Sequence, residues 1–140
     1  MHVQPYLFFE GRCEEALDFY GKALGARTQA LMRYKEAPPS DTPMPNVQPD
    51  KVMHAEFVVG DSTIMASDGM CSGKPTFGGV SLTVAAKDAA EAGKLFNALA
   101  DGGQVQMPLG PTFFAAAFGV LADRFGVSWM VIADPIGGPA

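Results

Sequence analysis

The fold is decided by a segment that occurs twice in outline, as PYLFFEGRCEEALDFYGKALGA at residues 5–26 and as GVSLTVAAKDAAEAGKLFNALA at residues 79–100. In each copy a short apolar run leads into a stretch whose apolar residues recur at helical spacing. Glu15 and Ala16 of the first copy match Glu91 and Ala92 of the second, about half a chain length apart. Self-similarity at a fixed offset indicates a repeated structural unit. The repeat predicts two modules of one kind, whose open sheets could enclose a ligand cleft.

Together with the residues on either side of these segments, the sequence pattern in each half of the chain predicts the element order βαβββ. The helix of the first copy should end at residue 24, because Gly25 suits the left-handed position that closes a helix. Asp88 and Glu91 form a capping pair for the second helix. We expect strands at residues 4–9, 27–34, 51–59, 62–67, 79–84, 104–109, 114–121 and 127–133. We therefore predict a single α+β domain, with modules at residues 3–68 and 79–134 and a linker at 69–78.

Residues 37–50 hold five prolines and are predicted to form a loop, since proline lacks a ladder donor. A loop of this length is either a lid over a site or simply a long connection. The closing segment, residues 134–140, is rich in proline and glycine and should be loose.

Composition excludes several classes of function. The 140 residues carry a formal net charge of -5, and no cluster of Lys and Arg stands ready to neutralise phosphates, so nucleic-acid binding is not expected. Cys13 and Cys71 do not have zinc-site spacing; Cys13 belongs to the apolar stripe of its helix and should be core. We find no apolar run of membrane-spanning length and no signal peptide. These features predict a soluble cytoplasmic protein without a membrane partner or a cofactor.

The opening PYLFFEGRCEEALDFYGKALGA, the hairpin VMHAEFVVGDSTIMASD at residues 52–68 and the closing DRFGVSWMVIADP at residues 123–135 resemble one known family. They are similar to the PhnB-like branch of the vicinal oxygen chelate superfamily, which includes glyoxalase I, bleomycin-resistance proteins and extradiol dioxygenases. Members of this branch often carry the label of a demethylubiquinone methyltransferase. The resemblance implies curved mixed sheets around a cleft, and a homodimer.

Metal-dependent members of that superfamily carry four ligands, on the first and last strand of each half. Carried over by motif, these positions fall at Gln4, Ala66, Gly79 and Met130, with a slip of one residue possible at each. Ala and Gly offer no ligand atom, and a thioether suits hard or borderline cations poorly. The resemblance therefore predicts a cleft in which the usual metal is not bound.

His54 and Glu56 are the candidate catalytic residues. Two positions apart on a strand, they share one face, and a carboxylate beside an imidazole can orient a base. The alternative is a surface pair or a pair at a subunit contact. Asp68 ends the neighbouring strand and either approaches the same cleft or forms a turn. With the resemblance, the predicted cleft is lined by Gln4, Phe8, His54, Glu56, Asp68, Ser81 and Met130.

Several functions follow from this pattern. The favoured hypothesis is a metal-free protein that binds a small, partly apolar molecule. A second is a lyase or isomerase that works through His54 and Glu56 or through a displaced divalent metal. The methyltransferase of the family label is less favoured, because the first strand–helix turn carries Gly11 alone. A protein-interaction module stays open as well. Neither the ligand nor any reaction can be named from these residues.

Overall fold

The structure is a computed structural model of the chain and describes residues 1–37 and 48–135. The chain divides into two compact units, Met1–Pro75 and Thr76–Ala140, and the division falls inside the predicted linker. The predicted proline loop and the predicted loose tail lie largely outside the described residues. No helix in the described ranges is long and apolar enough to cross a membrane.

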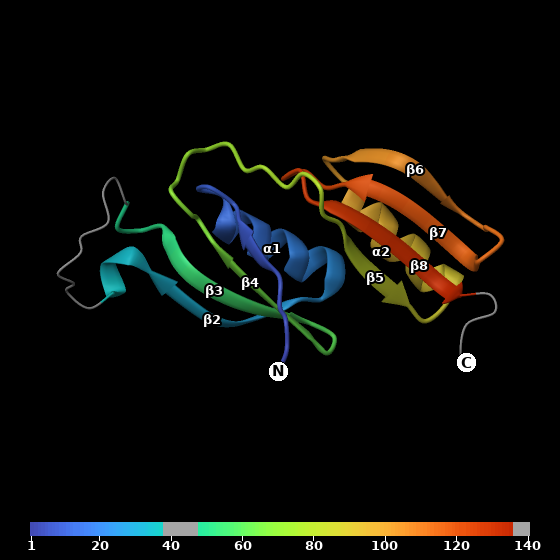
Figure 1. Ribbon diagram of the computed structural model, residues 1–140, viewed down its shortest axis with the longest axis horizontal. Helices are drawn as coiled ribbons and strands as arrows, with labels where there is room; N and C mark the ends of the chain where they lie inside the picture. The colour runs from blue at the N-terminus through green and yellow to red at the C-terminus, as the bar shows by residue number, and fades with distance from the viewer. Residues whose placement is uncertain (38–47, 136–140) are drawn as a thin grey trace. The chain divides into compact units, whose positions relative to one another are not determined.

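The first unit is a four-stranded sheet with one helix on it (Figure 1). The strand order is β1-β4-β3-β2, with β1 and β4 parallel and the other pairs antiparallel. Its elements are β1 (Tyr6–Phe8), α1 (Cys13–Leu24), β2 (Arg27–Arg33), the short 3-10 helix η1 (Tyr34–Glu36), β3 (Val52–Val59) and β4 (Ser62–Ser67).

The second unit repeats this plan. Its strand order is β5-β8-β7-β6, again with the first pair parallel and the others antiparallel. Its elements are β5 (Leu82–Ala86), α2 (Ala89–Ala100), β6 (Gln104–Gly110), β7 (Ala115–Ala122) and β8 (Ser128–Pro135). The predicted pair of βαβββ modules in an α+β fold is confirmed.

The helices end where their sequences indicate. Gly25 adopts φ 69°, and its N–H donates to the carbonyl of Tyr20. At α2 the Asp88 carboxylate accepts from the Glu91 N–H at 2.8 Å, so the predicted capping pair is confirmed. Each helix covers one face of its sheet with an apolar stripe, which in α1 includes the fully buried Cys13, Ala16 and Tyr20.

Two strands begin two or three residues later than the sequence predicts. Strand β1 starts at Tyr6 instead of residue 4, since Pro5 has no N–H to donate to a ladder. Strand β5 starts at Leu82 instead of residue 79, because Gly79 adopts φ 76°, which turns the chain away from the extended path.

Aromatic side chains fill the core between sheet and helix in the first unit. The rings of Tyr20 and Phe57 stack with centroids 5.7 Å apart, and Phe9 lies 6.1 Å from Tyr20. In the second unit the core contains Trp129, whose indole N–H donates to the Asp123 carboxylate at 2.9 Å. Trp129 is 2% exposed and is therefore part of this core. Since one face of each sheet is filled by its helix in this way, the sheet surface that a ligand can reach is the opposite face.

Candidate functional site

The candidate site lies on the face of the first sheet that is turned away from α1. Along β3, Ala55 and Phe57 are buried on the helix side, so His54 and Glu56 project from the other side. The strand register brings further side chains to this side: Tyr6 of β1 is paired with Met65 of β4, and Met65 with Glu56. We call the surface formed by Tyr6, Phe8, His54, Glu56 and Met65 the first open face.

A hydrogen-bonded relay crosses this face. The hydroxyl of Tyr6 lies 3.0 Å from His54 Nδ1, and His54 Nε2 lies 3.4 Å from Glu56 Oε1. The other carboxylate oxygen of Glu56 accepts from the Gln29 side-chain amide at 3.1 Å. The bond from Gln29, and after it the bond with His54, lowers the pKa of Glu56. The predicted pair His54 and Glu56 is thus in contact. Tyr6 extends the pair at the His54 end and Gln29 extends it at the Glu56 end.

Aromatic rings form an apolar surface next to the relay. Phe8 stacks on Tyr6 with centroids 4.9 Å apart, and Tyr6 lies 5.6 Å from the His54 ring. Phe8 is 53% exposed, which is unusual for a side chain of this size in a strand. Met32, the β2 neighbour of His54, is 40% exposed. An exposed aromatic ring beside polar groups is the surface that a partly apolar ligand requires.

Tyr6 is not among the predicted cleft residues, although the sequence contains a signal for it. Tyr6 and Phe8 are two residues apart on one strand, so placing Phe8 on the ligand face placed Tyr6 there as well. The partner of its hydroxyl, however, is 48 residues away in sequence.

Asp68, a predicted cleft residue, is 1% exposed, and both of its carboxylate oxygens accept backbone N–H bonds. Oδ1 accepts from Cys13 and Oδ2 from Val52, each at 2.7 Å. The carboxylate therefore closes the first turn of α1 and ties it to the start of β3. The predicted core position of Cys13 is confirmed; burial, with a smaller effect of Asp68, raises the pKa of its thiol.

The positions that the resemblance assigns to metal ligands do not fit a metal. Ala66 is fully buried on the helix side, and the residue before it on the open face, Met65, is again a thioether. Gly79 precedes β5 and has no side chain, and Met130 offers only sulfur. Only Gln4 has a ligand oxygen. Within residues 1–37 and 48–135, no group of three or more His, Cys, Asp or Glu is placed to hold a metal ion.

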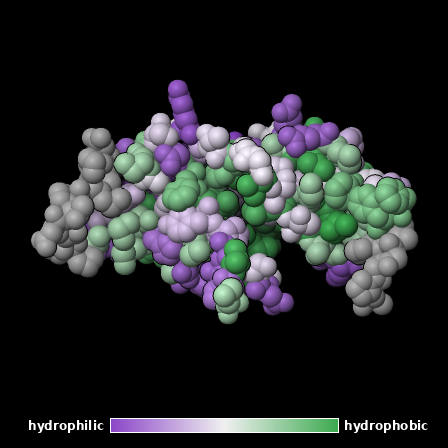
Figure 2. Space-filling view, viewed as in Figure 1, coloured by the Kyte–Doolittle hydropathy of each residue, from purple (hydrophilic) through white to green (hydrophobic). Residues whose placement is uncertain are grey.

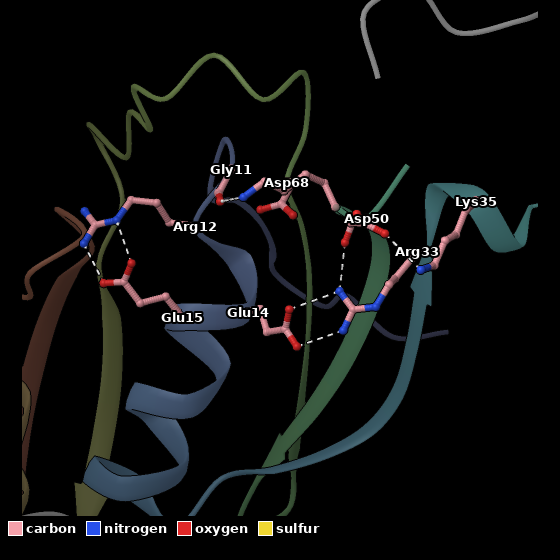
Figure 3. Close-up of a pocket in the computed structure, with 9 residues that line it drawn as sticks. Gly11, Arg12, Glu14, Glu15, Arg33, Lys35, Asp50 and Asp68 are labelled. Atoms are coloured by element: carbon pink, nitrogen blue, oxygen red, sulfur yellow. Dashed lines mark hydrogen bonds and ion pairs between the residues drawn. The ribbon is translucent and has the colours of Figure 1, made fainter. Parts of the chain in front are cut away.

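A charged hollow of about 530 Å³ lies elsewhere on the first unit, around the N-terminus of α1 (Figure 3). Arg33 binds Glu14 through two parallel contacts of 3.0 and 2.8 Å, which lowers the pKa of Glu14. Lys35 pairs with Asp50 at 2.9 Å, and the Lys51 ammonium donates to the Gly11 carbonyl. Because these opposite charges bind one another, we interpret the hollow as a structural ion-pair network.

The corresponding face of the second sheet is apolar. Met130 and Ile132 of β8 project from it beside Val120 and Phe118 of β7, their partners in the register. Figure 2 shows hydrophobic side chains gathered where Figure 1 draws β6, β7 and β8. The predicted cleft residue Ser81 precedes β5, and its hydroxyl lies 2.6 Å from that of Ser128. The titratable relay is therefore a feature of the first sheet, without a counterpart among the interactions described in the second.

Comparison with known proteins agrees with the fold. A glyoxylase/bleomycin resistance protein/dioxygenase domain from Frankia sp. EAN1pec matches with a TM-score of 0.59 at 14% identity, over 98% of this chain and 92% of that one. The fold is thus that of the glyoxalase and bleomycin-resistance proteins.

The chain belongs to the family described as 3-demethylubiquinone-9 3-methyltransferase, which matches residues 1–132. Protein YjdN of Escherichia coli K12 is 35% identical over 138 residues, which is 94% of each chain. Protein PA1353 of Pseudomonas aeruginosa is 44% identical, with a TM-score of 0.82 over 96% of this chain and 98% of that one. The PhnB protein of Bacillus cereus is 30% identical, with a TM-score of 0.78 over 95% and 99%. The predicted PhnB-like branch is confirmed.

Proposed function

We propose that this protein binds a small, partly apolar molecule on the first open face and that it does so without a resident metal. The observation that carries the proposal is the Tyr6–His54–Glu56 relay beside the exposed ring of Phe8. Small-molecule sites combine apolar surface with a few fixed polar groups. This face offers both on the neighbouring strands β1, β4 and β3.

We expect no resident metal because of the side chains that stand at the four carried-over ligand positions. A metal site of the inherited kind needs several oxygen, nitrogen or thiolate ligands. The inherited positions provide one amide, Gln4, together with alanine, glycine and thioether groups. Such a set holds no divalent ion tightly, so binding has to come from stacking and hydrogen bonds.

The proposal is tested with anilinonaphthalene sulfonate, a fluorescent aromatic dye. We expect the dye to bind the purified protein and Phe8→Ala to weaken binding about five-fold, because stacking on an aromatic ring contributes about 1 kcal/mol. Phe113→Ala is the matched control, since Phe113 is 91% exposed but belongs to the second unit. Equal weakening by both substitutions, or one tightly held divalent ion per chain in elemental analysis, would refute the proposal.

The relay also favours a second candidate function, acid–base catalysis. An imidazole that contacts a hydroxyl on one nitrogen and a carboxylate on the other has the arrangement of an oriented general base. A lyase or isomerase reaction would then lose its turnover in His54→Ala while the protein stays folded.

Methyl transfer, which the family description names, has less support in this chain. Methyl-donor sites typically open a helix with a glycine-rich loop, whereas the β1–α1 turn carries Gly11 alone. The Gly11 carbonyl accepts from the Lys51 ammonium, and Glu14 and Glu15 stand in the first turn of α1, so charged side chains surround the N-terminus of this helix. Calorimetric titration with S-adenosylmethionine tests this function, and we expect no binding.

A further inference from the structure

The relay on the first open face has a defined direction. Glu56 accepts from the Gln29 amide, and its lowered pKa keeps it ionised at neutral pH, so it can only accept. His54 Nε2 must therefore be the donor in its contact with Glu56. A neutral imidazole that donates from Nε2 accepts at Nδ1. When His54 is neutral, the Tyr6 hydroxyl therefore donates the hydrogen bond to its Nδ1.

This direction determines what Tyr6 presents to a ligand. Its single hydrogen is directed at His54, so its oxygen has only lone pairs left for another molecule. The ring of Phe8 stacks on the Tyr6 ring, and Met65 lies between Tyr6 and Glu56 in the strand register, which continues the apolar surface. A thioether side chain adapts to a flat ring without a fixed shape of its own.

We propose that the ligand is a planar aromatic molecule that carries a hydrogen-bond donor, a ring N–H or a phenolic O–H, and that Tyr6 accepts from this donor. The inference rests on the proposed function, since it names the class of ligand for the same face. Molecules of similar shape that can only accept would face the lone pairs of Tyr6 and leave them unpaired. The face should therefore distinguish ligands that donate a hydrogen bond from ligands that can only accept one, because an unsatisfied polar group lowers the binding affinity.

The direction of the relay can be tested without a ligand by the tautomer of His54. The chain has two histidines, His2 and His54, so nitrogen NMR of the labelled imidazoles is simple to assign. At a pH of about 8.5, where a free imidazole is neutral, we expect His54 to carry its proton on Nε2. In Glu56→Gln the amide oxygen accepts from Gln29 and the amide nitrogen can donate to His54, which favours the proton on Nδ1. A proton on Nδ1 in the unaltered protein would overturn the inference.

The class of ligand is tested with indole and quinoline, two bicyclic aromatics of similar size. Indole can only donate a hydrogen bond through its N–H, whereas neutral quinoline can only accept. We expect indole to bind about five-fold more tightly, the effect of one neutral hydrogen bond. Tyr6→Phe should abolish the preference and still bind both probes. Glu56→Gln should abolish or reverse it, because the Tyr6 hydroxyl is then free to donate outward.

Tyr34→Phe serves as the matched control, since it also removes one phenolic hydroxyl, whose partner is the Gly69 carbonyl at 2.7 Å. It should keep the preference for indole. Equal binding of indole and quinoline to the unaltered protein would overturn the inference, while dye binding that depends on Phe8 would still support the proposed function. If the dye, indole and quinoline all fail to bind, the proposed function itself is wrong.

Discussion

Replacing Asp68 with alanine should destabilise the first unit without acting through the ligand face. The carboxylate is 1% exposed and accepts the N–H groups of Cys13 and Val52 at 2.7 Å. Alanine leaves both groups buried without these acceptors, at about 1–3 kcal/mol each. With partial relaxation we expect a loss of about 3 kcal/mol in the free energy of unfolding, or roughly 10 °C in melting temperature.

Urea denaturation followed by far-ultraviolet circular dichroism measures this loss. Asp61→Ala is the control: Asp61 is an exposed residue of the β3–β4 turn, where a substitution should change stability by less than about 0.5 kcal/mol. If Asp68→Ala were as stable as Asp61→Ala, the structural role assigned to Asp68 would be wrong. Normal stability combined with weaker dye binding would instead support the cleft position that the sequence predicts.

Three further predictions concern other parts of the molecule. Asp123→Ala should destabilise the second unit by about 2–4 kcal/mol and shift the emission of Trp129 to longer wavelength, because Asp123 accepts from the Trp129 indole and from the N–H groups of Phe125 and Val127; unchanged emission would contradict this. Glu14→Gln should lower the free energy of unfolding by less than about 1 kcal/mol at pH 7, because the ion pair of Glu14 with Arg33 is exposed. Since Arg33 lowers the pKa of Glu14, this stabilisation is present above the ordinary carboxyl pKa and is lost as the pH falls through the lowered one, so a cost that persists at a pH of about 2 would be inconsistent with the pair. Cys13 should react with iodoacetamide only after unfolding, because burial raises the pKa of its thiol; rapid alkylation of the native protein at Cys13, read by mass spectrometry, would show that the helix packing is wrong.

The parts of the fold that were predictable are those that depend on neighbouring residues. The helix cap at Asp88 and Glu91 and the closing Gly25 depend on local hydrogen bonds, and the sequence predicts them correctly. The placement of His54 and Glu56 on one face follows from the alternation of a strand. These signals extend over a few residues, so one sequence suffices to find them.

The parts that were missed depend on contacts between distant segments. Asp68 binds a helix that begins 55 residues earlier, and Tyr6 binds an imidazole 48 residues later. Neither partner is indicated by spacing along the chain. The metal-ligand position carried over to Ala66 is also one residue away from the residue that projects from the open face, Met65. Only the register of β4 with β1 and β3 shows which of the two residues projects there. The expected homodimer remains a prediction, which light scattering would test.

Methionine methyl NMR during an indole titration tests the central claim most directly. Met65 lies in the middle of the first open face, and Met32 neighbours His54, whereas Met107 and Met130 belong to the second sheet. We predict that the methyl signals of Met65 and Met32 shift in proportion to bound indole and that Phe8→Ala reduces the shifts. Shifts confined to the methionines of the second sheet would contradict a ligand site at the Tyr6–His54–Glu56 relay.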